Sequence, residues 1–119
     1  MNRVAIVVLA DTETKEALGR VFNALMAADE FAEAGNEVRI VFDGAGVKWI
    51  VELSNPEHKA HGLFQKLKPH VTDVCRYCAG AFGVDDKVKG DDAPLTGGGY
   101  QDHPSFRQLV NDGFQVITF

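Results

Sequence analysis

The opening segment of the chain constrains its fold most strongly. Residues 4–10 are all apolar and rich in β-branched types, a pattern typical of a strand that is covered on both faces in a parallel sheet. Apolar residues then recur at helical spacing over residues 13–34, and Gly35-Asn36 ends that helix. A second strand is predicted over residues 37–42. Because strand, helix and strand follow one another, we predict a parallel sheet with right-handed crossovers and helices on both faces.

The rest of the chain continues this alternation, with one irregular segment. We predict a helix over residues 47–53, a polar helix over 55–68 that Pro69 breaks, and a third strand over 71–75. Residues 85–102 are rich in glycine and aspartate, and we place only a short fourth strand there, around 93–96. His103-Pro104 is predicted to begin a helix, with Pro104 at its first position. Residues 114–119 are predicted to form a closing strand inside the sheet, which completes one domain over 1–119.

Composition limits the possible partners and the compartment. The 119 residues carry a formal net charge of −5, which argues against nucleic acid or an anionic membrane as partner. The apolar run 4–10 is too short to span a bilayer, and acidic residues follow it where a signal peptide would be cleaved. The chain has 2 cysteines and no export signal, so we expect a cytoplasmic protein whose cysteines serve chemistry rather than stapling.

The candidate site follows from the strand ends. In open parallel sheets, ligands gather beyond the carboxyl ends of the strands, and residues 11–12, 43–46 and 75–78 converge there, where the loop with glycines 97–99 could close over them. Cys75 ends a strand and begins a helix, so helix N–H groups are expected to favour its nucleophilic thiolate form. Cys75 and Cys78 are the candidate catalytic residues. The candidate ligand-binding residues around them are Asp11, Gly44, Gly46, Arg76 and Tyr77.

The cysteine pair is also compatible with other chemical roles, and with a purely structural role. Cys78 lies one helical turn after Cys75, so it could form a disulfide with Cys75 or simply pack, and both thiols could be small buried hydrophobes. A thioredoxin-like role is a weak match, because the pair follows the third strand. A structural zinc site would need two more ligands, and His58 with His61, or His70 with His103, could supply them. Their spacing does not demand a metal, and we expect neither a metal nor a cofactor.

The order and spacing of several segments resemble those of the DsrE/DsrF-like family, which includes subunits of bacterial sulfur-relay complexes. The resemblance covers most of the chain and rests on the following segments: the strand 4–10, the helix reaching Ala34-Gly35, residues 37–47, Val74-Cys75 followed by Gly83-Val84, and residues 113–117. It implies an α/β fold of three α/β/α layers around a mostly parallel five-stranded sheet, and homotrimers, hexamers or related assemblies. Cys78 has no dependable counterpart in the relay members, and the irregular residues 85–102 depart from the expected compact fourth strand.

Three functions remain open from the sequence. In relay members of the family, the cysteine that matches Cys75 accepts sulfane sulfur as a persulfide and passes it to a partner thiol. The leading hypothesis is therefore a sulfur carrier or sulfurtransferase-like protein that holds a persulfide on Cys75 and meets donor and acceptor proteins. The second is a non-catalytic oligomeric module that binds a small molecule or a partner. The third is a redox protein that cycles a Cys75–Cys78 disulfide.

Overall fold

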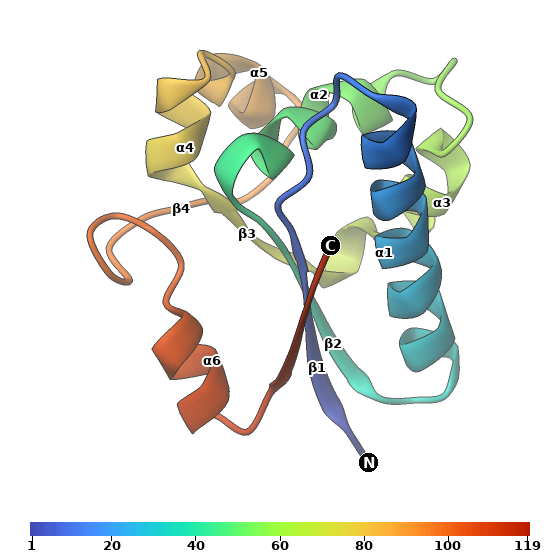
Figure 1. Ribbon diagram of the computed structural model, residues 1–119, viewed down its shortest axis with the longest axis vertical. Helices are drawn as coiled ribbons and strands as arrows, with labels where there is room; N and C mark the ends of the chain where they lie inside the picture. The colour runs from blue at the N-terminus through green and yellow to red at the C-terminus, as the bar shows by residue number, and fades with distance from the viewer.

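The computed structural model describes residues 1–119 as a five-stranded sheet flanked by helices (Figure 1). The strands are β1 (Arg3–Val8), β2 (Glu37–Phe42), β3 (Val71–Cys75), β4 (Leu95–Thr96) and β5 (Gln115–Thr118). The α-helices are α1 (Lys15–Glu33), α2 (Trp49–Ser54), α3 (His61–Leu67), α4 (Arg76–Ala81), α5 (Asp85–Gly90) and α6 (Phe106–Asn111). Two short 3-10 helices, η1 (Gly44–Lys48) and η2 (Lys68–His70), precede α2 and β3.

The sheet is parallel throughout, which confirms the predicted strand–helix–strand architecture. Its strand order is β4-β3-β2-β1-β5, and each of the four pairings is parallel. Strand β1 lies between β2 and β5, and Val4 is aligned with Val38 on one side and Gln115 on the other. All residues from Val4 to Val8 are fully buried. The continuous apolar run therefore reflects a strand that is covered on both faces.

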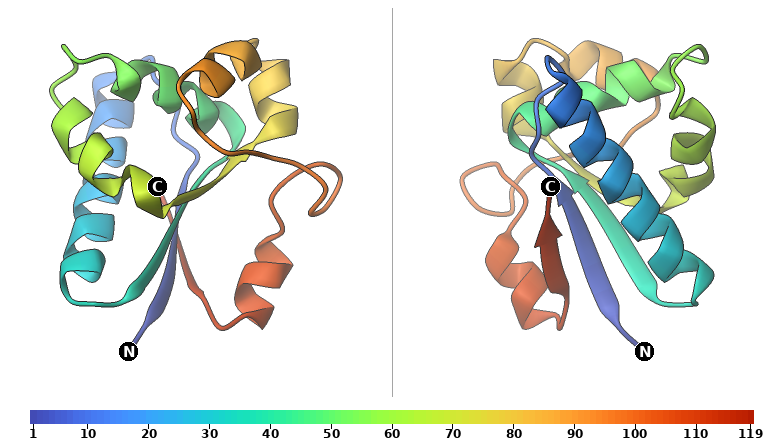
Figure 2. Two further views of the ribbon diagram at one scale, coloured as in Figure 1. Left: turned by 180° about the vertical axis from the view of Figure 1, so that it is seen from behind. Right: turned by 45° about the vertical axis from the view of Figure 1, so that its right-hand side comes forward.

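Helices cover both faces of the sheet, so the protein has the predicted three α/β/α layers. Val4, Ile6 and Val8 belong to the main core with residues of α1 and α3, whereas Ala5 packs with Leu109 of α6 and with Phe114. Figure 2 shows α1 and α6 on opposite sides of the strands. Burying each large aliphatic side chain contributes roughly 1.5–3 kcal/mol, and the main core is much the larger of the two. The layer formed by α6 is therefore the thinner one.

The closing strand lies at the edge of the sheet, so the prediction that it is inside was wrong. Strand β5 pairs only with β1. Its apolar residues are divided: Phe114 just before it is buried, whereas Ile117 retains 36% of its surface exposed. Apolar density alone does not distinguish an interior strand from an edge strand that is packed on one face.

Two helix starts also differ from the predictions. The polar helix begins at His61 rather than residue 55, because residues 55–60 form turns in which Asn55 Oδ1 accepts the N–H of Glu57 at 3.0 Å. The last helix begins at Phe106 rather than at His103-Pro104. Ser105 is its N-cap and accepts the N–H of Gln108 at 3.1 Å, as capping serines do. No helix of the protein combines the length and the apolarity needed to cross a membrane.

Gly46 provides a test of how closely the strand ends pack. It is buried in η1, and a Cβ at this position would overlap the backbone carbonyl of Val8. We expect Gly46→Ala to lower the free energy of unfolding by about 1–3 kcal/mol, because the clashing partner is backbone and cannot rotate away. Urea-induced unfolding followed by circular dichroism measures this change.

Gly19→Ala is the matched control. Gly19 is exposed within α1, and a Cβ there would have no neighbour within 4 Å. We expect this substitution to raise stability by about 0.5–1 kcal/mol, since alanine favours the helix. Equal effects of the two alanines would show that the η1–β1 contact is not tight.

Candidate functional site

The site begins where β2 and β3 end side by side. Phe42 is aligned with Val74 in the parallel pairing, so the next residues, Asp43 and Cys75, emerge together at the carboxyl edge of the sheet. Asp43 is the N-cap of η1 and accepts the N–H of Gly44 at 2.8 Å. Cys75 is the N-cap of α4. Each of these side chains is thus positioned by a strand on one side and a helical turn on the other.

The two cysteines are free thiols, and both are buried at the start of α4. The Sγ of Cys75 accepts the backbone N–H of Cys78 at 3.4 Å, and the Sγ of Cys78 donates to Oδ1 of Asp43, also at 3.4 Å. Cys75 is fully buried, and Cys78 is only 8% exposed. The helical turn of α4 therefore brings both sulfur atoms toward the end of β2.

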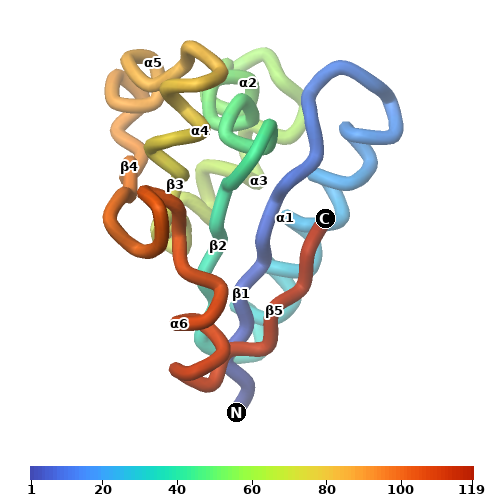
Figure 3. Tube along the Cα trace, turned by 60° about the vertical axis from the view of Figure 1, so that its left-hand side comes forward, coloured from blue at the N-terminus to red at the C-terminus, as the bar shows by residue number.

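A loop between β4 and α6 adds a histidine to this cluster. Nδ1 of His103 lies 3.1 Å from the Sγ of Cys75, 3.7 Å from the Sγ of Cys78 and 3.5 Å from Oδ1 of Asp43. The ring of Tyr77 packs against the imidazole with centroids 5.0 Å apart. In Figure 3 this loop runs beside β3 and below α4. The irregular segment therefore closes over the strand ends, as its glycines suggested.

An ion pair and close packing hold the loop in place. Nη2 of Arg76 lies 2.9 Å from Oδ1 of Asp102, and Arg76 lowers the pKa of Asp102 below its usual value. Gly97 passes directly beneath this pair, where a Cβ would overlap both side chains. Asp102 has a positive φ of 66°, a conformation that only a few residue types accept readily. The next residue, His103, is thereby directed at the cysteines.

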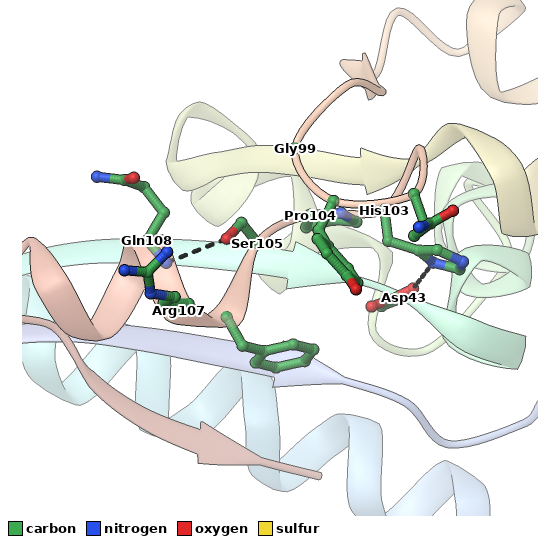
Figure 4. A pocket seen from close by; sticks show the side chains of 10 residues that line it. Asp43, Gly99, His103, Pro104, Ser105, Arg107 and Gln108 are labelled. Carbon is green, nitrogen blue, oxygen red and sulfur yellow. Dashed lines mark hydrogen bonds and ion pairs between the residues drawn. The ribbon is translucent and has the colours of Figure 1, made fainter.

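A cavity of about 690 Å³ adjoins the cluster on the side of α6. Asp43 and His103 form one end of it, and Arg107 and Gln108 line the other end (Figure 4). The carboxylate of Asp43 and the imidazole of His103 point toward each other in this view. The side chain of His103 is 36% exposed. The cavity therefore gives small molecules a route to the histidine, with the cysteines behind it.

Burial governs the acidity of the thiols. It raises the pKa of Cys75 to about 12, and the N–H of Cys78, which lowers that pKa, offsets burial only in part. Burial also raises the pKa of Cys78. The pKa of Cys75 is therefore shifted in the direction opposite to the prediction. The predicted N–H group at the start of α4 is present, but the exclusion of water destabilises the thiolate more than this one hydrogen bond stabilises it. The thiols are therefore protonated at neutral pH unless a base or an incoming group changes their surroundings.

The candidate ligand-binding residues are divided between this cluster and other contacts. Gly44 donates its N–H to Asp43, Arg76 anchors Asp102, and Tyr77 packs on His103. Asp11 instead pairs with Nζ of Lys48 at 2.6 Å, and Gly46 packs against β1. A ligand-binding role for each of them stays a prediction.

Sequence reasoning left two members of the cluster without their role. From the sequence, Asp43 is named only within the converging turn 43–46, and His103 only as the start of a helix and, with His70, as a possible zinc ligand. The signal for Asp43 is an aspartate directly after a buried strand; His103 has no local signal, because a distant ion pair positions it. His58 and His61 lie elsewhere and bond to the backbone, His58 with the N–H of Ala60 and His61 with the carbonyl of Leu53.

Comparison with known proteins agrees with the fold and the predicted resemblance. The sequence matches the DsrE/DsrF-like family over residues 2–119, and the chain belongs to this family. An uncharacterised protein of Methanocaldococcus jannaschii is 30% identical over 100 residues, which cover 82% of this chain and 78% of that protein. A solved structure of a conserved protein of unknown function from Bacteroides thetaiotaomicron shares the fold, with a TM-score of 0.66 at 19% identity over 97% of this chain and 94% of that one.

The raised pKa predicts slow thiol alkylation in the folded protein. In Cys78→Ser, we expect Cys75 to react with iodoacetamide at about pH 8 at least tenfold more slowly than in denaturant, because only the thiolate is nucleophilic. The rate should continue to rise above pH 9.0, where the rate of a thiol with the ordinary pKa begins to level off. Quenched alkylation followed by peptide mass spectrometry measures it. Rapid reaction of the folded protein at about pH 6 would contradict this assignment.

Proposed function

We propose that the protein is a sulfur carrier that holds sulfane sulfur as a persulfide on Cys75. Membership of the DsrE/DsrF-like family, which includes sulfur-relay subunits, supports this function. The observation that carries the proposal is the distance of 3.1 Å between the Sγ of Cys75 and Nδ1 of His103. A protonated, buried thiol needs a base, and an imidazole in contact with it is the side chain best suited to take its proton near neutral pH.

Loading is a redox-neutral transfer. His103 accepts the proton of Cys75, and the resulting thiolate attacks the outer sulfur of a donor persulfide. A new S–S bond forms at Cys75, the S–S bond of the donor breaks, and the donor leaves as a thiolate that takes up the proton. The arrangement of nucleophile and base follows the general pattern of an activated cysteine.

Release has two balanced routes. The thiolate of an acceptor can attack the outer sulfur, which returns Cys75 to the thiol and carries the sulfur away. Alternatively, the thiolate of Cys78 attacks the inner sulfur, which forms a Cys75–Cys78 disulfide and expels hydrosulfide. Both sulfur atoms lie within 4.8 Å of each other in the cluster, so the second route needs only a small movement. An external thiol must then reduce the disulfide.

Access to Cys75 requires movement of the loop. The sulfur is fully buried behind His103 and the carbonyl of Asp102. The ion pair between Arg76 and Asp102 that fixes the loop is partly exposed, with 58% and 40% of the two side chains accessible. Exposed pairs of this kind contribute roughly 0–1 kcal/mol. The ion pair therefore opposes displacement of the loop only weakly, and a docking donor must mainly disrupt the packing at Gly97 and the contacts of His103.

Persulfide loading tests the proposal. Reduced protein is incubated with cysteine persulfide in the presence of a chelator, and its intact mass is recorded over time. We expect wild type and Cys78→Ser to gain the mass of one sulfur atom, and Cys75→Ser to gain none. Cys78→Ser should hold the sulfur longer, because it cannot form the disulfide. His103→Ala should load about a hundredfold more slowly, since the base is removed. Equal loading of Cys75→Ser and wild type would reject the carrier function.

A thiol–disulfide redox function is the second candidate, and a specific contact favours it. The N–H of Cys78 bonds to the Sγ of Cys75 across a single helical turn, and the two sulfur atoms lie within 4.8 Å of each other, so they must approach further to form a disulfide bond. In this reaction the two thiols lose two electrons and two protons to glutathione disulfide, which is reduced to two glutathione molecules.

Titration in glutathione redox buffers distinguishes this candidate. We expect a reversible intramolecular disulfide, seen as the loss of both free thiols without dimer formation, with a defined midpoint potential. Cys75→Ser and Cys78→Ser should each retain their remaining thiol or form only mixed disulfides. If wild type keeps both thiols free in the most oxidising buffer, the redox function is excluded.

A further inference from the structure

We propose that Asp43, Cys75, Cys78 and His103 form a tetrahedral binding site for Zn²⁺. The four side chains offer two sulfur atoms, one imidazole nitrogen and one carboxylate oxygen, and these atoms all lie within 4.8 Å of one another. Zinc sites in proteins use this kind of donor set, with four ligands when the ion is structural. The proposal goes beyond the carrier function, since it concerns metal binding by the reduced thiols.

Four of the six distances between the donor atoms are close to the edges of a zinc tetrahedron. With ordinary zinc–ligand bond lengths, the edge is about 3.5 Å between sulfur and nitrogen, about 3.5 Å between sulfur and oxygen, and about 3.4 Å between nitrogen and oxygen. Nδ1 of His103 lies 3.1 and 3.7 Å from the two sulfur atoms. Oδ1 of Asp43 lies 3.4 Å from the Sγ of Cys78 and 3.5 Å from Nδ1 of His103. The other two distances, between the two sulfur atoms and between Oδ1 of Asp43 and the Sγ of Cys75, are at most 4.8 Å. Side-chain adjustments therefore let all four atoms bind one ion.

The position of Asp43 differs from that of the orienting acid in a proton relay and suits a shared ion. In a relay of nucleophile, base and orienting acid, the acid contacts the second nitrogen of the imidazole. Here Cys75, Cys78 and Asp43 all approach the same atom, Nδ1 of His103. The four donor atoms therefore form one compact group, as the ligands of a metal ion do.

The chemistry of the donors selects the type of metal. Two thiolates and an imidazole suit a borderline-soft ion such as Zn²⁺, whereas Mg²⁺ and Ca²⁺ prefer oxygen ligands only. Backbone groups also support the ligands: the N–H of Gly44 bonds to Oδ1 of Asp43, and the N–H of Cys78 bonds to the Sγ of Cys75. Such outer contacts fix ligand orientation and compensate part of the negative charge.

Metal binding and sulfur loading use the same atoms. Zn²⁺ displaces the protons of Cys75 and Cys78 and occupies both sulfur atoms, so a zinc-loaded chain has no thiolate free to attack a persulfide. The ion also contacts His103, the base of the loading step. Zinc and sulfane sulfur are therefore mutually exclusive ligands of this cluster.

Two measurements on the full-length, reduced protein test the site without any sulfur donor. Zn²⁺ is titrated in competition with a chromophoric chelator, and we expect one ion per chain. Co²⁺ is then used as a spectroscopic substitute, and we expect intense visible bands of tetrahedral geometry together with thiolate-to-metal charge-transfer bands. Weak octahedral bands without charge transfer, or no stoichiometric binding of Zn²⁺, would overturn the proposal even if no variant folds.

Variants locate the ion. Asp43→Asn, Cys75→Ser, Cys78→Ser and His103→Ala should each weaken Zn²⁺ binding by at least about tenfold, because every ligand of a structural site contributes to affinity. His70→Ala is the matched control, since His70 is a histidine outside the cluster, and its binding should equal that of wild type. Unchanged affinity in the cysteine variants would show that zinc binds elsewhere and would reject the site.

A final experiment separates this inference from the carrier function. The chelator assay needs no donor, and the loading assay contains a chelator, so either can fail while the other succeeds. Zinc-loaded protein should resist cysteine persulfide until the metal is removed. If it gains sulfur at the metal-free rate, the cysteines are not ligands and the inference is wrong.

Discussion

The alignment of β2 with β3 is the constraint on which the whole site depends. Parallel pairing of Phe42 with Val74 makes Asp43 and Cys75 neighbours at the point where the backbone leaves the sheet. Helical turns begin at both residues, so neither side chain can rotate far from the edge. A slip of one residue in this register would turn one of them to the opposite face. Backbone hydrogen bonds between β2 and β3 therefore determine the geometry of the candidate site, although these bonds involve none of its side chains.

The parts of the fold that depend on local burial were predictable, and those that depend on distant contacts were not. The continuous apolar run at residues 4–8 and the helical periodicity of α1 each indicate their surroundings without any distant contact. The position of His103 depends on Arg76, which pairs with Asp102 across 26 residues, and no local pattern encodes such a contact. The start of α6 was misplaced for a related reason: Pro104 suits a first helical position, but His103 is held at the cysteines and the turn begins only after Ser105.

The pKa of Cys75 is raised, whereas the sequence predicted that it would be lowered. The strand–helix junction and the helix N–H group exist as expected, but the loop excludes water from the sulfur, and burial dominates the thiol pKa. The same enclosure brings an imidazole and a carboxylate into contact with the thiols. One arrangement thus suppresses ionisation of the thiols and brings beside them the groups on which both the proposed sulfur transfer and the proposed metal site depend. The predicted assembly into trimers or hexamers stays a prediction.

The shortness of β4 ties exposure of the sulfur to a local opening of the sheet. Only Leu95 and Thr96 form this edge strand, and Thr96 is aligned with Cys75 itself. Few backbone hydrogen bonds hold such a strand, so it belongs to the least protected part of the structure in amide exchange. When it separates from β3, the covering loop loses its attachment beside Cys75 and is held by the ion pair between Arg76 and Asp102. In the proposed carrier, fraying of this two-residue ladder is thus a step toward exposing the sulfur, and its equilibrium constant limits the fraction of the protein that can react at any moment.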